Sequence, residues 1–189
     1  MYVINLWGAP SSGKSTTAAG LFFLMKVNKM KVELVTEYAK DLVWSERNNI
    51  FNEQNKIFAE QAHRLNRLDG KIDYAITDSP LPLTVFYEPK EHSQHFEPMV
   101  LEKFNTYKNI NFLLKRVSDF ENFGRIHSEQ ESDIISNQMQ KFLEFNKIEY
   151  TELEATPTTP NKILESVVEK TQPKYWNKEQ MRDLTVSSK

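Results

Sequence analysis

The stretch YVINLWGAPSSGKSTTAAG, residues 2–20, decides the fold that we predict for this chain. Its first part, Tyr2–Leu6, is a short run of apolar, β-branched and aromatic residues, which predicts a buried strand. A helix is predicted from Gly13 to about Lys26. The residues that join them, Gly8–Ser15, fit the pattern G-x-x-x-x-G-K-[ST] at every defined position. A strand, this loop and a helix in direct succession predict a phosphate-binding loop, or P-loop.

The residue types of this loop suit the phosphate chain of a nucleoside triphosphate. Its two glycines let the backbone curl, so that successive N–H groups point at phosphate oxygens. The start of the helix adds the positive end of its dipole. We expect Lys14 to reach the β- and γ-phosphates and the Ser15 hydroxyl to bind Mg²⁺. The predicted ATP contacts of the loop are Gly8, Ser11, Ser12, Gly13, Lys14 and Ser15.

Strands and helices alternate along the rest of the chain. Further strands are predicted at Lys31–Val35, Tyr74–Thr77, Ile110–Leu114 and Ile148–Leu153, and further helices at Ile50–Leu68, Ser128–Phe145 and Thr159–Lys170. The alternation predicts a three-layer α/β P-loop fold: a five-stranded, mostly parallel sheet with helices on both faces. We expect one domain over residues 1–170 and a tail or short extra helix over residues 171–189.

Two acids follow predicted strands, at the edge where ligands bind in such sheets. Asp78, after the third strand, is expected to hold Mg²⁺ directly or through water; the alternative is a turn-forming role before Ser79-Pro80. Glu37, after the second strand, is expected to accept the proton of an acceptor hydroxyl. Its alternative role is to favour the start of the next helix.

A basic segment, FLLKRVSDFENFGRIHSEQ, runs from the fourth strand to residue 130 and carries Arg116 and, behind Gly124, Arg125. Guanidinium groups bind phosphate oxygens through paired N–H donors. We therefore predict a lid over about residues 116–130 that brings both arginines to the phosphates and excludes water. The alternative is a solvated loop with two unrelated surface arginines.

Three further residues are left with open roles. Gln54 and Gln61 are seven residues apart and share one face of the predicted long helix. A glutamine there reads the edge of a base, or, as is more common, lies on the solvated helix surface. Trp44 stacks on a planar ligand ring or is an ordinary core or lid aromatic, and the sequence favours neither.

Composition excludes several classes of protein. The 189 residues carry a formal net charge of -2, which disfavours a nucleic-acid binder although a local basic strip of Lys103, Lys108 and Lys115 remains open. Without cysteine there is no disulfide, thiolate nucleophile or cysteine zinc site. The chain is too short for the second helical domain of AAA+ machines, and it lacks the N-K-x-D motif of GTPases. No signal peptide or membrane span is found, so we expect a cytoplasmic protein.

The order of the P-loop, TEYAK, the glutamine-bearing helix, ITDSP and KRVSDFENFGR resembles small P-loop kinases. It is most similar to the nicotinamide riboside kinase domain of bacterial NadR-type proteins and to phage proteins with an AAA domain, and more distantly to thymidylate and deoxynucleoside kinases. The resemblance adds Thr16 to the ATP- and Mg²⁺-binding residues. It also matches Glu37 to the base of deoxynucleoside kinases, and Arg116 and Arg125 to lid arginines. Ser79 departs from those relatives, which carry arginine after the acid of the third strand.

The sequence therefore predicts an ATP- and Mg²⁺-dependent phosphotransferase. Its catalytic residues are expected to be Lys14, Glu37, Asp78, Arg116 and Arg125, and its metal ligands Ser15 and Asp78. The expected acceptor is a nucleoside, a nucleotide or a similar small metabolite. A kinase acting on a nucleic-acid end or a modified DNA base, and an NTP-hydrolysing regulatory switch, are the alternatives. A homodimer is compatible with the sequence, which does not set the oligomeric state.

Overall fold

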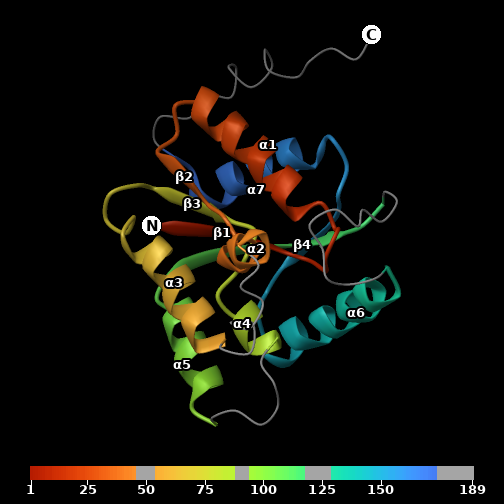
Figure 1. Cartoon of the computed structure of the whole chain (residues 1–189). Coiled ribbons are helices and arrows are strands. Elements are labelled where there is room, and N and C mark those ends of the chain that lie inside the picture. Colours follow the sequence, from red (N-terminus) through yellow and green to blue (C-terminus); the bar gives the residue numbers. More distant parts are fainter. Residues whose placement is uncertain (46–53, 88–93, 118–128, 174–189) are drawn as a thin grey trace.

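The fold is a five-stranded parallel sheet between two layers of helices (Figure 1). The structure, a computed structural model, describes residues 1–45, 54–87, 94–117 and 129–173. The strands are β1 (Tyr2–Trp7), β2 (Val32–Val35), β3 (Tyr74–Thr77), β4 (Lys108–Lys115) and β5 (Thr151–Glu154). The helices are α1 (Lys14–Val27), α2 (Tyr38–Trp44), α3 (Gln54–Asn66), α4 (Leu83–Phe86), α5 (Phe96–Asn105), α6 (Glu129–Phe145) and α7 (Thr159–Thr171).

The strands follow the order β2-β3-β1-β4-β5, and each neighbouring pair is parallel. The first strand, which leads into the P-loop, therefore lies at the centre of the sheet. Its register with β3 pairs Asn5 with Thr77, and its register with β4 pairs Trp7 with Leu113. Since all strands run in one direction, their carboxyl ends lie at the same edge of the sheet.

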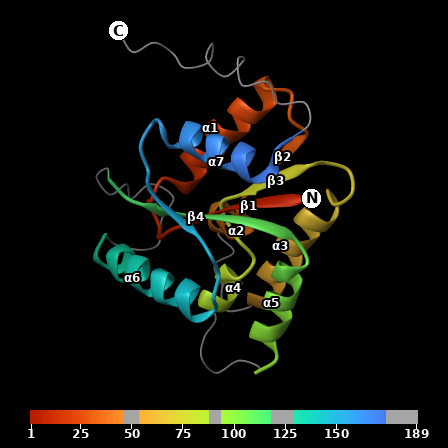
Figure 2. The same ribbon diagram turned by 180° about the vertical axis from the view of Figure 1, so that it is seen from behind.

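Alternation along β1 divides the core into two halves. Val3 and Trp7 face α3, α5 and α6, whereas Ile4 and Leu6 face α1 and α7. Figures 1 and 2 show these two helix layers on opposite faces of the sheet. A strand buried on both faces is the usual state of a parallel sheet, which explains the nearly continuous apolar run from Tyr2.

The predicted fold class and all five strands are confirmed, the third with its predicted bounds and the others with shifted ends. The fourth strand extends two residues earlier and one later than predicted, and the fifth begins at Thr151 instead of Ile148. The helix after it begins at Thr159 as predicted, and the Thr159 hydroxyl donates a hydrogen bond to the Glu154 carbonyl. The predicted helix at 50–68 is described from Gln54 to Asn66.

Three helices were not predicted from the sequence: α2, α4 and α5. The segment before α5 is polar and flanked by proline, which hid an apolar stripe at Phe96, Val100 and Phe104. These three residues are four apart, so they share one helix face, and all three are buried in the core. The other two helices have seven and four residues, too few for a periodic pattern to register.

In the part of the chain that the structure describes, none of the helices has the length and apolarity needed to cross a membrane.

Candidate functional site

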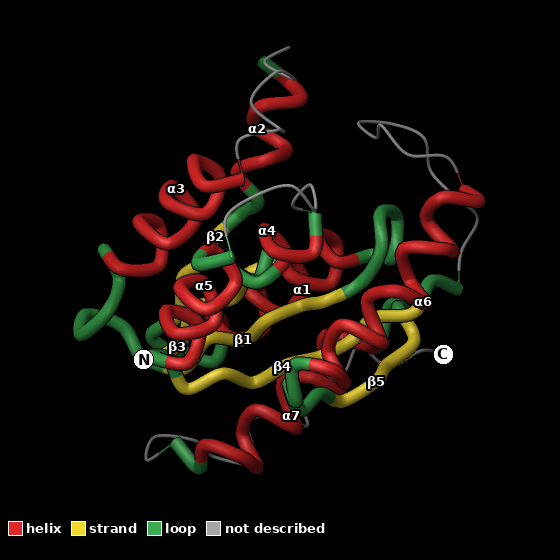
Figure 3. Tube along the Cα trace, turned by 90° about the horizontal axis from the view of Figure 1, so that it is seen from below, coloured by secondary structure: helices red, strands yellow, loops and turns green. Residues whose placement is uncertain are grey.

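The candidate site is built from loops that leave the carboxyl ends of neighbouring strands. The P-loop follows β1, Glu37 follows β2 by two residues, Asp78 follows β3 directly, and Arg116 follows β4 directly. Because β3 and β4 both pair with β1, their loops flank the P-loop on opposite sides. Figure 3 shows the same division, with α2 and α3 on the side of β2 and α6 on the side of β4 and β5.

The P-loop needs glycine at both ends for steric reasons. Gly8 has a φ of 149°, and a Cβ there would lie 2.8 Å from the Leu114 carbonyl oxygen and collide with the side chain of Ser12. Gly13 has a φ of 81°, and a Cβ there would lie 2.9 Å from the Cβ of Ala155. The loop is therefore pressed against β4 on one side and against the β5–α7 connection on the other.

Lys14 lies over its own loop. Its Nζ donates hydrogen bonds to the carbonyls of Gly8, at 2.8 Å, and Ala9, at 3.0 Å. No side chain caps α1, whose N-cap position is Gly13, and no acid occupies its first turn. An uncapped helix start beside an ammonium group is a site for an anion. Ser15 is half-buried, Thr16 is exposed, and Ser11 and Ser12 are buried in the loop.

Asp78 is almost fully buried, with 6% of its surface exposed. Burial raises the pKa of its carboxyl group, and the ammonium groups of Lys14 and Lys40 together with the backbone N–H groups of Asp78 and Glu37 oppose that rise. Its Oδ1 atom has no hydrogen-bond partner among the described residues. A buried carboxylate with one unsatisfied oxygen beside the P-loop fits a direct or water-mediated ligand of Mg²⁺.

Glu37 occupies the N-cap position of α2, but its side chain makes no capping hydrogen bond. Its backbone N–H donates to the Asp78 carboxylate, so the two acids stand next to each other. Tyr87, just after α4, lies in the field of the Glu37 carboxylate; desolvation first, and that charge second, raise the pKa of its phenol. Lys40 thus acts electrostatically on Asp78, and Glu37 acts on Tyr87. Sequence reasoning predicted neither Lys40 nor Tyr87 as a site residue.

Gln61 is not on the solvated helix surface, where sequence reasoning placed it as the more common case. It is 1% exposed. Its Oε1 accepts a hydrogen bond from the Tyr38 backbone N–H at 3.2 Å, and its Nε2 donates to the Thr36 carbonyl and the Thr77 hydroxyl at 3.4 and 3.3 Å. It therefore joins the ends of β2 and β3 to the start of α2, which is the frame that carries Glu37.

Two other residues with open roles are now located. Gln54, at the start of α3, is buried, so the solvated helix surface is also wrong for this glutamine. Trp44, at the end of α2, is 55% exposed, which excludes the core alternative.

Arg116 is largely buried and pairs with Asp133 of α6, its Nη2 atom lying 2.5 Å from Oδ1. Arg125 and most of the predicted lid, residues 118–128, lie outside the described residues. The predicted role of Arg125 therefore stays a prediction, as does the tail beyond residue 173.

Sequence reasoning missed Ser132 and Asp133, which lie near the start of α6 on the β4 side of the P-loop. The Ser132 hydroxyl donates a hydrogen bond to the Pro10 carbonyl at 2.7 Å. The only sequence signal was an acid near a helix start, which is common and points to no partner. Contacts across 17 and 122 residues depend on the packing of α6 against the sheet.

The proposed lysine strip is divided by the fold. Lys108 and Lys115 are the first and last residues of β4, about 23 Å apart along a strand. Lys115 also pairs with Glu152 at 2.8 Å, and Lys103 lies over the ring of Tyr107 at the far end of the molecule from the P-loop. The three lysines do not form one continuous surface at the site.

The described residues fit a magnesium–nucleotide complex better than a metal held by protein alone. Nowhere in residues 1–45, 54–87, 94–117 and 129–173 do three His, Cys, Asp or Glu side chains gather as a metal site. Mg²⁺ keeps most of its waters and is commonly held by one or two protein groups together with substrate phosphates. Ser15, Asp78 with its unsatisfied oxygen and the uncapped start of α1 supply such a partial site.

Comparison with known proteins supports the same class. A family model described as an AAA domain matches residues 3–159, which include the sheet except Tyr2 and every described site residue. No curated protein matches the chain. The chain therefore belongs to this family of P-loop NTPase domains.

Proposed function

We propose that this AAA-domain protein is an ATP- and Mg²⁺-dependent phosphotransferase that moves the γ-phosphate to a nucleoside, a nucleotide or a similar small metabolite. The observation that carries the proposal is the second carboxylate, Glu37, beside Asp78. Binding of nucleotide and metal is accounted for by the P-loop, Ser15 and Asp78, and it does not require a second carboxylate beside Asp78. Transfer to a hydroxyl requires a group that accepts its proton, and a carboxylate at this position supplies one.

Each part of the proposed reaction has a residue of suitable chemistry. Lys14 and the P-loop N–H groups would bind the β- and γ-phosphates, with Ser15, Thr16 and Asp78 on the side of the metal. Bound Mg²⁺ neutralises charge on the β- and γ-phosphates. The Glu37 carboxylate accepts the proton as the acceptor oxygen forms its bond to the γ-phosphorus, and the bond from that phosphorus to the bridging oxygen of ADP breaks. Arg116, and Arg125 by resemblance, would stabilise the charge on the transferred group.

The surroundings of Glu37 favour a small acceptor. Lys40 and Tyr87 stand close to the two carboxylates, so an acceptor that lies against Glu37 meets a cation and a phenol that keeps its proton at neutral pH. These groups suit the hydroxyls of a sugar or the anionic part of a metabolite. The divided lysines give no comparable support to a nucleic-acid acceptor.

A metabolite panel tests the proposal. ATP consumption by the full chain is measured with Mg²⁺, with and without each nucleoside and nucleotide, and the products are identified by mass. A phosphorylated small molecule is the expected result. Phosphorylation of oligonucleotides alone would replace the acceptor class, and slow hydrolysis that no acceptor stimulates would favour a regulatory switch.

A substitution separates Glu37 from the donor site. Glu37→Gln should keep ATP affinity and lower transfer to a hydroxyl by roughly 100- to 10,000-fold, since the general base is lost. Glu33→Gln is the matched control, because that acid lies on β2 in an exposed pair with Lys26. Unchanged turnover in the Glu37 variant would remove it from the mechanism and would favour a phosphate acceptor, which carries no proton that must leave.

A further inference from the structure

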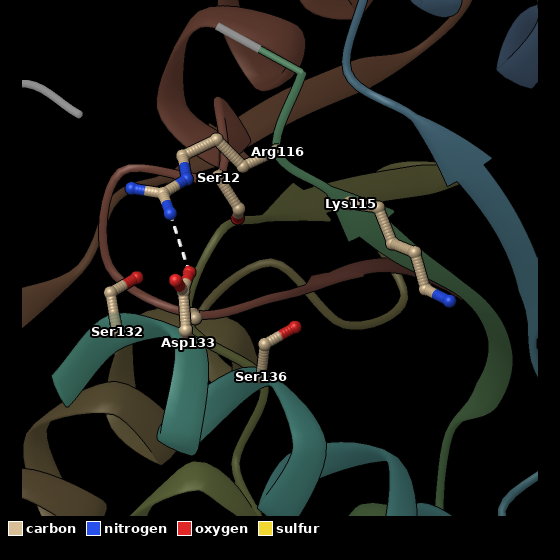
Figure 4. A pocket seen from close by; sticks show the side chains of 7 residues that line it. Ser12, Lys115, Arg116, Ser132, Asp133 and Ser136 are labelled. Carbon is tan, nitrogen blue, oxygen red and sulfur yellow. Dashed lines mark hydrogen bonds and ion pairs between the residues drawn. The ribbon is translucent and has the colours of Figure 1, made fainter. Parts of the chain in front are cut away.

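A cavity of about 160 Å³ lies on the β4 side of the P-loop, outside the group formed by Glu37 and Asp78. It is bounded by the P-loop, the end of β4 and the first turns of α6 (Figure 4). Its lining is mainly polar: Ala9, Ser12, Lys115, Arg116, Ser132, Asp133 and Ser136. The cavity thus lies between the P-loop and the two elements, β4 and α6, that precede and follow the predicted lid.

Two contacts between described residues join α6 to the other walls of this cavity. Arg116 reaches from the end of β4 to Asp133, with 2.5 Å between Nη2 and Oδ1. The neighbouring residue, Ser132, is buried and hydrogen-bonds the Pro10 carbonyl of the P-loop. Figure 4 shows the guanidinium and the Asp133 carboxylate pointing toward each other across the space. One turn of α6 therefore holds both the phosphate loop and the arginine.

The two partners in the ion pair differ in exposure. The side chain of Arg116 is 16% exposed, whereas that of Asp133 is 63% exposed. An exposed carboxylate adds little to folding stability through an ion pair. It does restrict the arginine, because an unrestrained guanidinium on a long side chain samples many rotamers, and ordering such a side chain on binding costs free energy. The pair thus acts on the orientation of Arg116 more than on the fold.

The cavity also contains a group that indicates a ligand nearby. Ser12 is 3% exposed, and its Oγ has no hydrogen-bond partner among the described residues. Both Ser12 and Arg116 line the same space. The arginine is therefore held beside the P-loop, whose N–H groups would bind the phosphates. The polar cavity around it contains a buried side-chain oxygen, Ser12 Oγ, that accepts and donates no hydrogen bond among the described residues.

We propose that Asp133 is a positioning residue, which holds the Arg116 guanidinium at the wall of the P-loop so that the arginine is already oriented when the nucleotide binds. The inference rests on the proposed function for the role of Arg116, and it adds that α6 supplies the orientation. Ser132 sets the location of Asp133, since its bond to Pro10 fixes the same turn of the helix against the loop.

A double-mutant cycle tests this role. The affinity of the full chain for a non-hydrolysable ATP analogue with Mg²⁺ is measured by calorimetry for wild type, Asp133→Ala, Arg116→Ala and the double variant. Asp133→Ala should weaken binding by roughly 3- to 30-fold in the wild-type background and have no further effect once Arg116 is absent, because directly paired groups are strongly coupled. Asp133→Glu should restore most of the affinity. Glu144→Gln, an exposed acid on the same helix, is the matched control.

Three outcomes would overturn the proposal. The first is an undiminished effect of Asp133→Ala in the Arg116→Ala background. The second is wild-type affinity in Asp133→Ala. The third is tighter binding in that variant, which would mean that the ion pair keeps Arg116 away from the nucleotide. Because the cycle measures nucleotide affinity, it remains informative if the metabolite panel finds no acceptor. Thermal unfolding of each variant identifies any loss that comes from the fold alone.

Discussion

The β3 side and the β4 side of the P-loop hold their functional groups in different ways. On the β3 side, Gln61 and Asp78 are buried, and the Gln61 amide is bonded to three groups from α2 and the ends of β2 and β3. On the β4 side, Arg116 is held by an exposed carboxylate across a cavity, and one serine hydroxyl ties α6 to the loop.

The difference corresponds to two chemical tasks. The proposed metal ligand Asp78 and the proposed base Glu37 need fixed positions before a substrate arrives, and the Gln61 hydrogen-bond network joins the segments that carry them. In the proposed function Arg116 acts on the phosphates only after the nucleotide has entered, and a pair with an exposed acid orients it without enclosing it. The groups on the β3 side are thus held in fixed positions by burial and hydrogen bonds, whereas Arg116 on the β4 side is oriented by one ion pair and can still change rotamer.

Among tests of this comparison, the largest effect is expected where the two sides meet, at Lys14. Lys14→Met removes the ammonium group from the proposed phosphate site and should lower ATP-dependent turnover by roughly 100- to 1,000-fold. Lys26→Met, on the exposed end of the same helix, is the control, since Lys26 pairs with the surface acid Glu33 and lies over the ring of Phe22. Steady-state turnover and ATP affinity are measured for both. Equal ATP affinity in the Lys14 variant and wild type would contradict a phosphate role for this lysine.

The next effect concerns the packing of the P-loop against β4. Gly8→Ala introduces a Cβ that lies 2.8 Å from the Leu114 carbonyl oxygen and collides with the Ser12 side chain, so the loop must move. We expect a loss of roughly 1–3 kcal/mol in the free energy of unfolding, measured in urea, together with weaker ATP binding.

Gly70→Ala is the matched control for this variant. It has a φ of 73°, but no atom lies within 4 Å of the added Cβ. It therefore carries the strain of a positive φ without the collision, so it should lose about 1–2 kcal/mol, less than Gly8→Ala, and keep ATP affinity. Equal losses at both glycines would mean that contact with β4 is unimportant.

A smaller effect tests the rigidity of the β3 side. Gln61→Leu keeps the side-chain volume but leaves the Tyr38 N–H without its acceptor, which should cost roughly 1–3 kcal/mol of unfolding free energy. Gln138→Leu, on the exposed face of α6, should stay within about 0.5 kcal/mol of wild type. Urea unfolding measures both variants. If they behaved alike, the amide network would not hold the frame of Glu37.

The smallest effect concerns the cost of burying Asp78. Because burial raises the pKa of this carboxyl group, the folded protein binds the proton more tightly than the unfolded chain. The carboxylate therefore lowers stability at neutral pH, and this penalty disappears as the pH falls through the raised pKa toward the ordinary value of 3.8.

Asp78→Asn should accordingly raise the melting temperature of the protein in EDTA at pH 7, and the gain should shrink as the pH falls to 4. Glu165→Gln, on the exposed face of α7, is the control and should show no such trend. Thermal melts at a series of pH values measure the difference. A lower melting temperature for the Asn variant at pH 7 would contradict the buried-carboxylate interpretation.

Much of the fold was predictable because its signals are local. The Tyr2–Leu6 run, the glycine-lysine loop and the alternation of strands with helices each depend on residues close together in sequence, and the fold class and strands are confirmed. The α5 helix was missed because its three buried aromatic and aliphatic residues are embedded in polar sequence. Its helical state depends on the core against which Phe96 and Phe104 pack.

The candidate site likewise contains residues that local sequence signals predicted and residues that only the tertiary structure revealed. The P-loop residues, Glu37, Asp78 and Arg116 were each identified by a motif or by their place after a strand, and the fold brings their segments to one edge of the sheet. Gln61 was misread, because a polar residue on a helix is ordinarily solvated, and only the packing of α3 against β2 and β3 buries it. Ser132 and Asp133 carried no sequence signal that points to a partner.

The sequence by itself determined the donor side of this protein, since a phosphate-binding loop is one continuous segment whose glycines and lysine act through the adjacent backbone. Tertiary structure alone decided the strand order, the burial of Asp78 beside Glu37 and the pairing of Arg116 with Asp133. The physical reason is distance along the chain. Dehydration of a carboxylate and orientation of a guanidinium come from groups tens of residues away, which reach the site only when the sheet and its two helix layers have formed.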